Sequence, residues 1–212
     1  MPFQRRYYVP GTHKEKLVDL KGKVGTGWLA LYCPKGWNSF WSRLIADSTR
    51  GPYSHAAMLR VVTACDRTPC DGETIDLLEM KEGAGGRAIP FESMVKSYPG
   101  CWDLYQPDLE RWPEYNAEAA VAYMRELTGK KYGKRALYQL IIRRIPILWH
   151  WFRCKMEDPR RWSYPPFCSF AVEIACRNGG KVQPVMNLQA DMVTPNDLCH
   201  SPFWNYYATA MP

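Results

Sequence analysis

The chain has 212 residues, of which 46% are hydrophobic and 23% charged, and its formal net charge is +7. This length suits one domain with a sizeable core and exceeds that of a small disulfide-stapled scaffold. The longest charge-free apolar run has eight residues (145–152), too few to span a bilayer. The start is basic but lacks the apolar segment of a signal peptide, so we expect cytoplasmic synthesis.

In the first half of the chain, we expect a polar, loose N-terminal extension over 1–24 and one domain over 25–212. Short apolar or alternating runs bounded by Pro, Gly or polar residues predict strands at 27–34, 53–62, 73–80 and 101–107. Apolar residues at helical spacing predict helices at 35–51 and 90–98.

The second half is mainly helical. Helices are predicted at 114–129, at 134–145, from Pro166 to the stop at Asn178–Gly180, and as a short turn at 194–203 with Thr194 as its N-cap. A final strand is predicted at 203–210. The mixture predicts an α+β fold with a mostly antiparallel sheet and segregated helices.

Basic charge gathers in one stretch, since residues 125–161 contain eleven Lys or Arg and three acidic residues. Its part over 134–161 is also apolar and rich in Trp, as suits contact with a membrane surface or an anionic polymer. The alternative is a solvated helix whose apolar face packs on the core, and we favour this reading because amphipathic helices usually face the core.

Eight cysteines are present at irregular spacing, and no pair forms a C-x-x-C motif. We therefore expect mostly free thiols, no zinc or other metal site, and no cofactor. Cys168 differs from the rest because it lies in the first turn of a predicted helix. Partial positive charge there stabilises a thiolate, although a buried apolar cysteine at a helix start remains an alternative.

A histidine partner for Cys168 is suggested by strand periodicity. His55 shares one strand face with Ala57, Leu59 and Val61, and Glu79 shares one with Ile75 and Leu77. If residues pair when their numbers sum to 134, His55 and Glu79 are cross-strand neighbours. Such a pair suits an oriented general base, or a buried ion pair that only stabilises the fold.

Several short motifs together resemble a known family. They are "GPYSHAAML" (51–59), "LLEM" (77–80), "TGKKYG" (128–133), "FCSFAVEIA" (167–175) and "TPNDLCHSP" (194–202). In order and spacing, over about 25–204, they resemble the circularly permuted papain-like enzymes. These are the permuted branch of the NlpC-type cysteine hydrolases, with lecithin–retinol acyltransferase as a distant cousin.

The resemblance implies a permuted papain-like fold with a Cys168 nucleophile, a His55 base and Glu79 to orient the base. The Cys168 backbone N–H would serve the oxyanion site. Family members often have an aromatic residue with a hydroxyl directly before the cysteine, whereas this chain has Phe167. Two alternatives follow: Tyr164 supplies the hydroxyl, or this chain lacks it. The residues expected to line the substrate site are Tyr53, Ser54, Tyr164 and Phe167.

The expected function is hydrolysis of an amide through an acyl-enzyme, with a cell-wall peptide as the first substrate class. A lipid amidase, esterase or acyltransferase is the alternative. The basic, apolar segment 134–161 slightly favours it, and this segment would form a lid or a lipid- or wall-facing surface beside the thiol. A wall enzyme without a signal peptide would need delivery by a phage or a secretion system. An alternative of another class is a non-enzymatic module that binds anionic membrane or nucleic acid, of which nucleic acid is the less expected partner.

Overall fold

The structure is a computed structural model that describes residues 13–34, 49, 51–63, 73–98, 100–144, 150 and 165–212. Most of the predicted helix at 35–51 (35–48 and 50) and the end of the predicted helix at 134–145 lie outside these residues. None of the helices in the described ranges has both the length and the apolar character needed to cross a bilayer.

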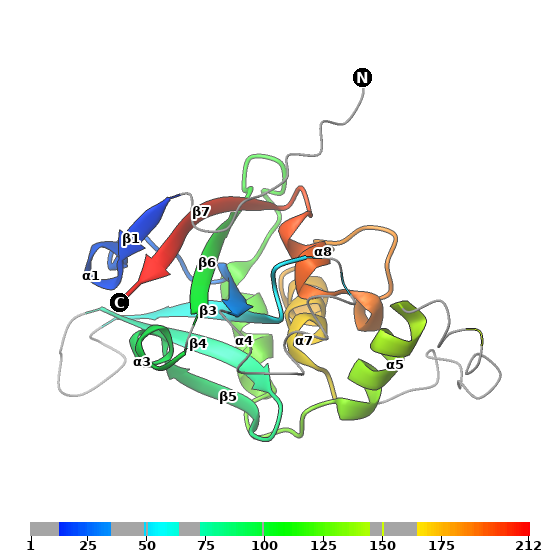
Figure 1. The fold of residues 1–212 in the computed structure, drawn as a ribbon. Helices are drawn as coiled ribbons and strands as arrows, with labels where there is room; N and C mark the ends of the chain where they lie inside the picture. Colours follow the sequence, from blue (N-terminus) through cyan, green and yellow to red (C-terminus); the bar gives the residue numbers. More distant parts are fainter. Residues whose placement is uncertain are drawn as a thin grey trace.

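A seven-stranded mixed sheet forms the centre of the fold (Figure 1). Its spatial order is β1-β7-β6-β2-β3-β4-β5, and every neighbouring pair is antiparallel except β1 with β7. The bounds are β1 Lys14–Lys16, β2 Leu29–Pro34, β3 His55–Val62, β4 Thr74–Lys81, β5 Gly85–Pro90, β6 Gly100–Pro107 and β7 Trp204–Met211.

Helices cover both faces of this sheet. Their bounds are α1 Leu17–Leu20, α3 Phe91–Ser97, α4 Ala117–Glu126, α5 Lys134–Arg144, α7 Cys168–Ile174 and α8 Pro195–Cys199. A π-helical turn, η4 (Ala175–Gly179), continues α7, and a 3₁₀ turn, η5 (Ala190–Met192), precedes α8. Figure 1 shows α1 and α3 apart from α4 and α7, with the strands between them.

The period of two along the strands divides the core into two clusters. On one face, Leu31, Met58 and Leu78 pack with α4, α7 and α8. On the other face, Ala57 and Leu77 pack with α1 and α3. This division confirms the predicted strand faces, because side chains of successive strand residues point to opposite sides.

Helix ends follow the local sequence. The Asn116 side chain caps α4 by accepting a hydrogen bond from the Ala119 N–H (3.0 Å), and Thr194 and Asp197 form a reciprocal capping box on α8. Gly129, just beyond α4, has φ +81°, a conformation that glycine adopts without steric strain. These features confirm the predicted helix at 114–129 and the cap at Thr194.

The structure corrects three predictions. The expected loose segment is wrong for residues 14–20, because β1 pairs with β7 and Leu20 of α1 is fully buried. Strand β5 was not predicted, since its Gly85–Gly86 start is typical of a loop. The helix predicted from Pro166 to Asn178–Gly180 is α-helical only over Cys168–Ile174, after which the π-helical turn η4 follows.

Candidate functional site

Cys168 is the first residue of α7, and the preceding prolines bring the chain to that point in extended conformation. Phe167, the N-cap residue, has φ −93° and ψ −177°, so the helix begins sharply at Cys168. The helix packs against β3 and β4, and the side chain of Cys168 is buried (2% exposed). The Cys168 sulfur accepts hydrogen bonds from the backbone N–H groups of Ala56 and Ser169.

His55 is the first residue of β3 and lies beside Glu79. The His55 Nε2 is 2.5 Å from the Glu79 Oε2, and Glu79 is almost fully buried. The other ring nitrogen, Nδ1, remains for the Cys168 thiol, to which the His55 ring is hydrogen-bonded. The structure therefore brings the three residues singled out from sequence, His55, Glu79 and Cys168, into one connected group.

The strand register differs from the one predicted. Strands β3 and β4 pair at Met58 with Leu78 and at Leu59 with Leu77, so the paired numbers sum to 136 and not 134. His55 and Glu79 are therefore diagonal neighbours, which a long carboxylate side chain can bridge. His55 and Glu79 stay on one face of the sheet in this register, because a shift of two residues between the strands preserves which side chains share a face. A shift of one residue would have placed them on opposite faces.

Charges within this group shift the pKa values of His55 and Glu79 so that both side chains favour their charged forms. Burial alone lowers the pKa of His55, but the charges of Glu79 and Cys168 raise it to about 10. Burial raises the pKa of the Glu79 carboxyl, whereas the His55 charge and hydrogen bonds from His55 and Arg87 bring it down to about 2. Near neutral pH the imidazole is therefore protonated and the carboxylate is ionised.

The same charges and hydrogen bonds shift the pKa of the Cys168 thiol. Burial raises the pKa of Cys168, but the positive charge and hydrogen bond of His55 and the two backbone N–H groups outweigh it, so the pKa is lowered. Burial instead raises the pKa of Cys176 and Cys199. The arrangement thus favours a thiolate–imidazolium pair at Cys168, the reactive form of a cysteine.

Arg87 extends the group and was not found from sequence. It lies directly opposite Glu79 in the β4–β5 ladder, and its Nε is 2.7 Å from the Glu79 Oε1, with a second bond from Nη2. Both carboxylate oxygens are therefore occupied, one by Arg87 and one by His55. The signal was hidden because β5 itself was not recognised as a strand.

Tyr132 brings a hydroxyl to Cys168 from the motif 128–133. The Tyr132 hydroxyl is hydrogen-bonded to the thiol and to the backbone N–H of Cys168. Burial and the negative charges of Cys168 and Glu82 raise the pKa of Tyr132, so the hydroxyl keeps its proton. This hydroxyl comes from a different segment than the position before the cysteine, where Phe167 has none.

Glycines hold the motif in this place. Gly86 donates to the Lys130 carbonyl (2.9 Å), and the Gly86 carbonyl accepts from Gly129 (2.8 Å). At the other end Gly133 donates to the Pro166 carbonyl (3.1 Å), and a Cβ at Gly133 would lie 1.9 Å from the Pro165 carbonyl oxygen. The motif is therefore pinned both to β5 and to the segment that enters α7.

Helix α5 forms an apolar wall beside Cys168. Its buried residues Ala136, Leu137, Leu140 and Ile141 pack in one cluster with Phe167 and Cys168. This packing confirms the favoured interpretation of residues 134–144, an amphipathic helix whose apolar face joins the core. Of the rest of the predicted insertion (134–161), the structure describes only His150, so its predicted membrane contact stays a prediction.

The residues expected to line the substrate site have different positions. Tyr53 and Phe167 are fully buried, and the Tyr53 hydroxyl donates to Asp103 (2.7 Å). Ser54 is buried, and its Oγ has no hydrogen-bond partner among the described residues. Tyr164 lies outside the described residues. The roles of these side chains in substrate binding stay predictions.

Asn196 of the motif 194–202 fixes the entry to β3. Its Oδ1 accepts from the Tyr53 N–H (3.0 Å) and its Nδ2 donates to the Tyr53 carbonyl (2.9 Å). A side-chain amide thus satisfies both backbone groups of a buried residue two positions before His55. The motif therefore helps to hold the strand end that carries the histidine.

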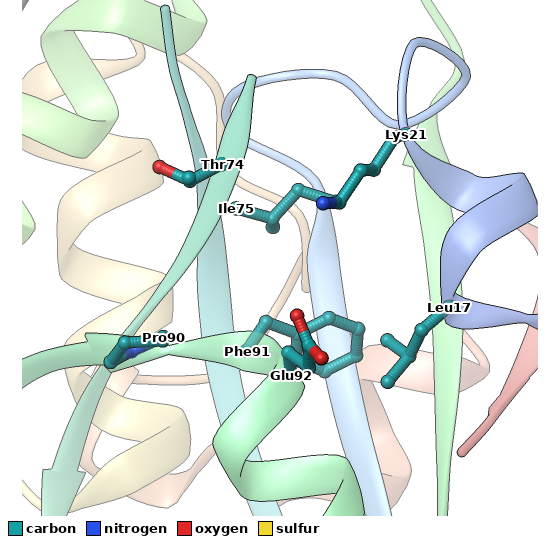
Figure 2. Close-up of a pocket in the computed structure, with 7 residues that line it drawn as sticks. All are labelled: Leu17, Lys21, Thr74, Ile75, Pro90, Phe91 and Glu92. Carbon is teal, nitrogen blue, oxygen red and sulfur yellow. The ribbon is translucent and has the colours of Figure 1, made fainter. Parts of the chain in front are cut away.

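A pocket of about 80 Å³ lies elsewhere, where the start of β4 meets α1 and α3 (Figure 2). It is lined by Leu17, Lys21, Thr74, Ile75, Pro90, Phe91 and Glu92, none of which belongs to the group around Cys168. Its volume is far below the roughly 300 Å³ of small ligand sites. Across the described part of the chain, no three His, Cys, Asp or Glu residues are grouped so as to hold a metal ion.

No established protein family matches the chain, and no curated protein matches it.

Proposed function

We propose that this protein is a cysteine hydrolase that cleaves an amide bond through an acyl-enzyme. Cys168 is the nucleophile, His55 the general base and acid, and Glu79 the residue that orients and charges His55. The observation that carries the proposal is the continuous contact from Glu79 through the His55 ring to a thiol of lowered pKa. The same chain order, His on a strand and Cys on a later helix, supports a permuted papain-like version of the α+β fold.

The reaction follows from these positions. The Cys168 thiolate attacks the carbonyl carbon, and the electrons of the C=O bond move to the oxygen. The oxyanion accepts hydrogen bonds from the Cys168 N–H and the Tyr132 hydroxyl. Collapse of this intermediate breaks the C–N bond, and His55 gives its proton to the leaving amine. Water then attacks the thioester while His55 takes its proton, which releases the acid and restores the thiolate.

The substrate class divides into two proposals. A cell-wall peptide amide is the first, on the resemblance of the motifs alone. A fatty-acyl amide or ester is the second, and one observation favours it: α5 places Leu137, Leu140 and Ile141 in the same cluster as the nucleophile. An apolar acyl chain would find a hydrophobic surface there, whereas a peptide would leave polar groups against it.

Trapping of the acyl-enzyme tests the proposal. The protein is incubated with p-nitrophenyl acetate and p-nitrophenyl octanoate, and the release of nitrophenol is followed together with the mass of tryptic peptides. We expect a burst of nitrophenol and an acyl group on the Cys168 peptide. Cys168→Ala should abolish both, while Cys176→Ala, which removes another buried thiol on the same helical segment, should preserve them.

An acyl group on another residue, or a burst that survives Cys168→Ala, would overturn the nucleophile assignment. A faster burst with octanoate than with acetate would support the acyl-chain substrate. The binding-module alternative predicts no burst, together with binding to anionic vesicles or DNA that falls steeply with salt and is unchanged in Cys168→Ala.

A further inference from the structure

A second pair of thiols lies away from Cys168, on strands β2 and β6. Cys33 and Cys101 are directly opposite each other in this antiparallel ladder. Opposite residues point to the same face, with Cα atoms about 4.5 or 5.5 Å apart. Both spacings fall within the 4.4–6.8 Å that a disulfide spans. The two thiols are hydrogen-bonded to each other in the reduced form.

This pair lies one residue beyond the ends of the two neighbouring ladders. Pairing of β2 with β3 stops at Tyr32 with His55, and pairing of β6 with β7 stops at Trp102 with Ala210. Among the described residues, Cys33 and Cys101 therefore pair with each other beyond the last paired residues of the two neighbouring ladders. Both are partly exposed, so a small reagent can reach them.

The two thiols are also unequal. The hydrogen bond from Cys101 lowers the pKa of Cys33, despite burial and the charge of Asp103. The same bond, with burial, raises the pKa of Cys101. This asymmetry favours Cys33 as the attacking thiol and Cys101 as the thiol that resolves the product.

We propose that Cys33 and Cys101 form a reversible thiol–disulfide site whose co-reactant is a low-molecular-weight disulfide. The Cys33 thiolate attacks one sulfur of the small disulfide, which expels one small thiolate and leaves a mixed disulfide on Cys33. The Cys101 thiol loses its proton and attacks the Cys33 sulfur, which expels the second small thiol. Two protein thiols are oxidised, and one small disulfide is reduced to two thiols.

Disulfide mapping with oxidised glutathione tests the site. The full-length protein is incubated with oxidised glutathione, quenched with acid and digested without reduction. We expect one cross-linked peptide pair joining Cys33 to Cys101, lighter by two hydrogens, which an excess of reduced glutathione reverses. Cys101→Ser should stop at a glutathione adduct on Cys33, and Cys33→Ser should give at least tenfold less adduct on Cys101.

Other results would overturn the proposal. One is a glutathione adduct that persists on Cys33 in the wild-type protein without the cross-link, and another is a link from Cys33 to a different cysteine. Cys168→Ala should form the cross-link as readily as wild type, so the outcome is independent of the proposed hydrolase activity. Circular dichroism of each variant checks that the fold is retained, and a Cys33→Ala, Cys101→Ala double variant must show no linked peptide.

Discussion

Replacement of Glu79 by Gln removes the charge that holds His55 in its protonated form, and it changes the shape of the side chain very little. Glu79 bridges His55 and Arg87 and is almost fully buried. Of the two charges that raise the pKa of His55, that of Glu79 is the larger, and the other is that of Cys168. Without Glu79, burial is opposed only by the thiolate.

The magnitude follows from the shifted pKa. The pKa of His55 stands at about 10 against an ordinary value of 6.5, a difference equivalent to about 5 kcal/mol in favour of the charged ring. When most of that preference is lost, the ring is neutral at pH 7 and Cys168 behaves at best as an ordinary thiol. A thiol that titrates near 9.0 is ionised in about one molecule in a hundred at pH 7. The higher intrinsic reactivity of a more basic thiolate offsets part of this loss, so we expect Cys168 to alkylate more slowly at pH 7, by roughly tenfold.

Iodoacetamide labelling, read by peptide mass spectrometry from pH 5 to 9, measures this rate. In Glu79→Gln, the midpoint of the rise of Cys168 labelling with pH should move to higher pH than in wild type, because the pKa of the thiol is no longer lowered by a protonated His55. Asp76→Asn is the matched control, since Asp76 is a buried carboxylate on the same strand that pairs with Arg60 (3.9 Å). The rate at Cys33 serves as an internal reference in every sample.

Two results would refute this reasoning. If Glu79→Gln labels with the wild-type pH profile, the carboxylate does not sustain the ion pair. If Asp76→Asn slows labelling equally, the effect comes from general destabilisation of β4. Arg87→Met separates the contributions further, since it removes one hydrogen-bond partner of Glu79 while leaving the Glu79 charge and its contact with His55 in place, and it should therefore move the profile much less than Glu79→Gln.

Three further predictions concern the oxyanion partner, the apolar wall and the pH dependence of stability. Tyr132→Phe should lower kcat for p-nitrophenyl acetate by about 100-fold with KM little changed, because one oxyanion donor is lost; an unchanged kcat would exclude this role. Leu140→Ala should lower the free energy of unfolding in urea by about 2–5 kcal/mol, whereas Tyr138→Ala, at an exposed position of the same helix, should change it by less than about 0.5 kcal/mol. The depressed pKa of Glu79 contributes stability that is complete above pH 4.5 and is lost as the pH falls toward about 2. The raised pKa of His55 contributes stability that is complete below pH 6.5 and is lost as the pH rises toward about 10. Urea unfolding should therefore give a plateau between pH 4.5 and 6.5, and in Glu79→Gln the slopes on both sides should flatten; a wild-type slope in this variant would contradict the assignment.

Periodicity along the chain determined much of the sheet. The period of two placed His55 and Glu79 on one strand face without knowledge of their exact pairing, and the structure keeps them there at a different register. Helical spacing and caps located α4, α7 and α8, because these signals depend on neighbours within a few residues. Cys168 at the start of a helix was readable for the same reason, since Pro165 and Pro166 stop the preceding chain.

Contacts between distant segments were decided only by the tertiary structure. Arg87 reaches Glu79 because β5 pairs with β4, although Gly85 and Gly86 give that strand the sequence of a loop. Tyr132 reaches Cys168 because backbone contacts of Gly86 and Gly133 pin its motif at both ends. A local sequence pattern does not predict these contacts, because they depend on which distant backbone segment packs closely against each glycine. The sequence alone therefore identified the nucleophile, base and carboxylate as candidates, and the packing of the sheet against α7 supplied the partners that charge and orient them.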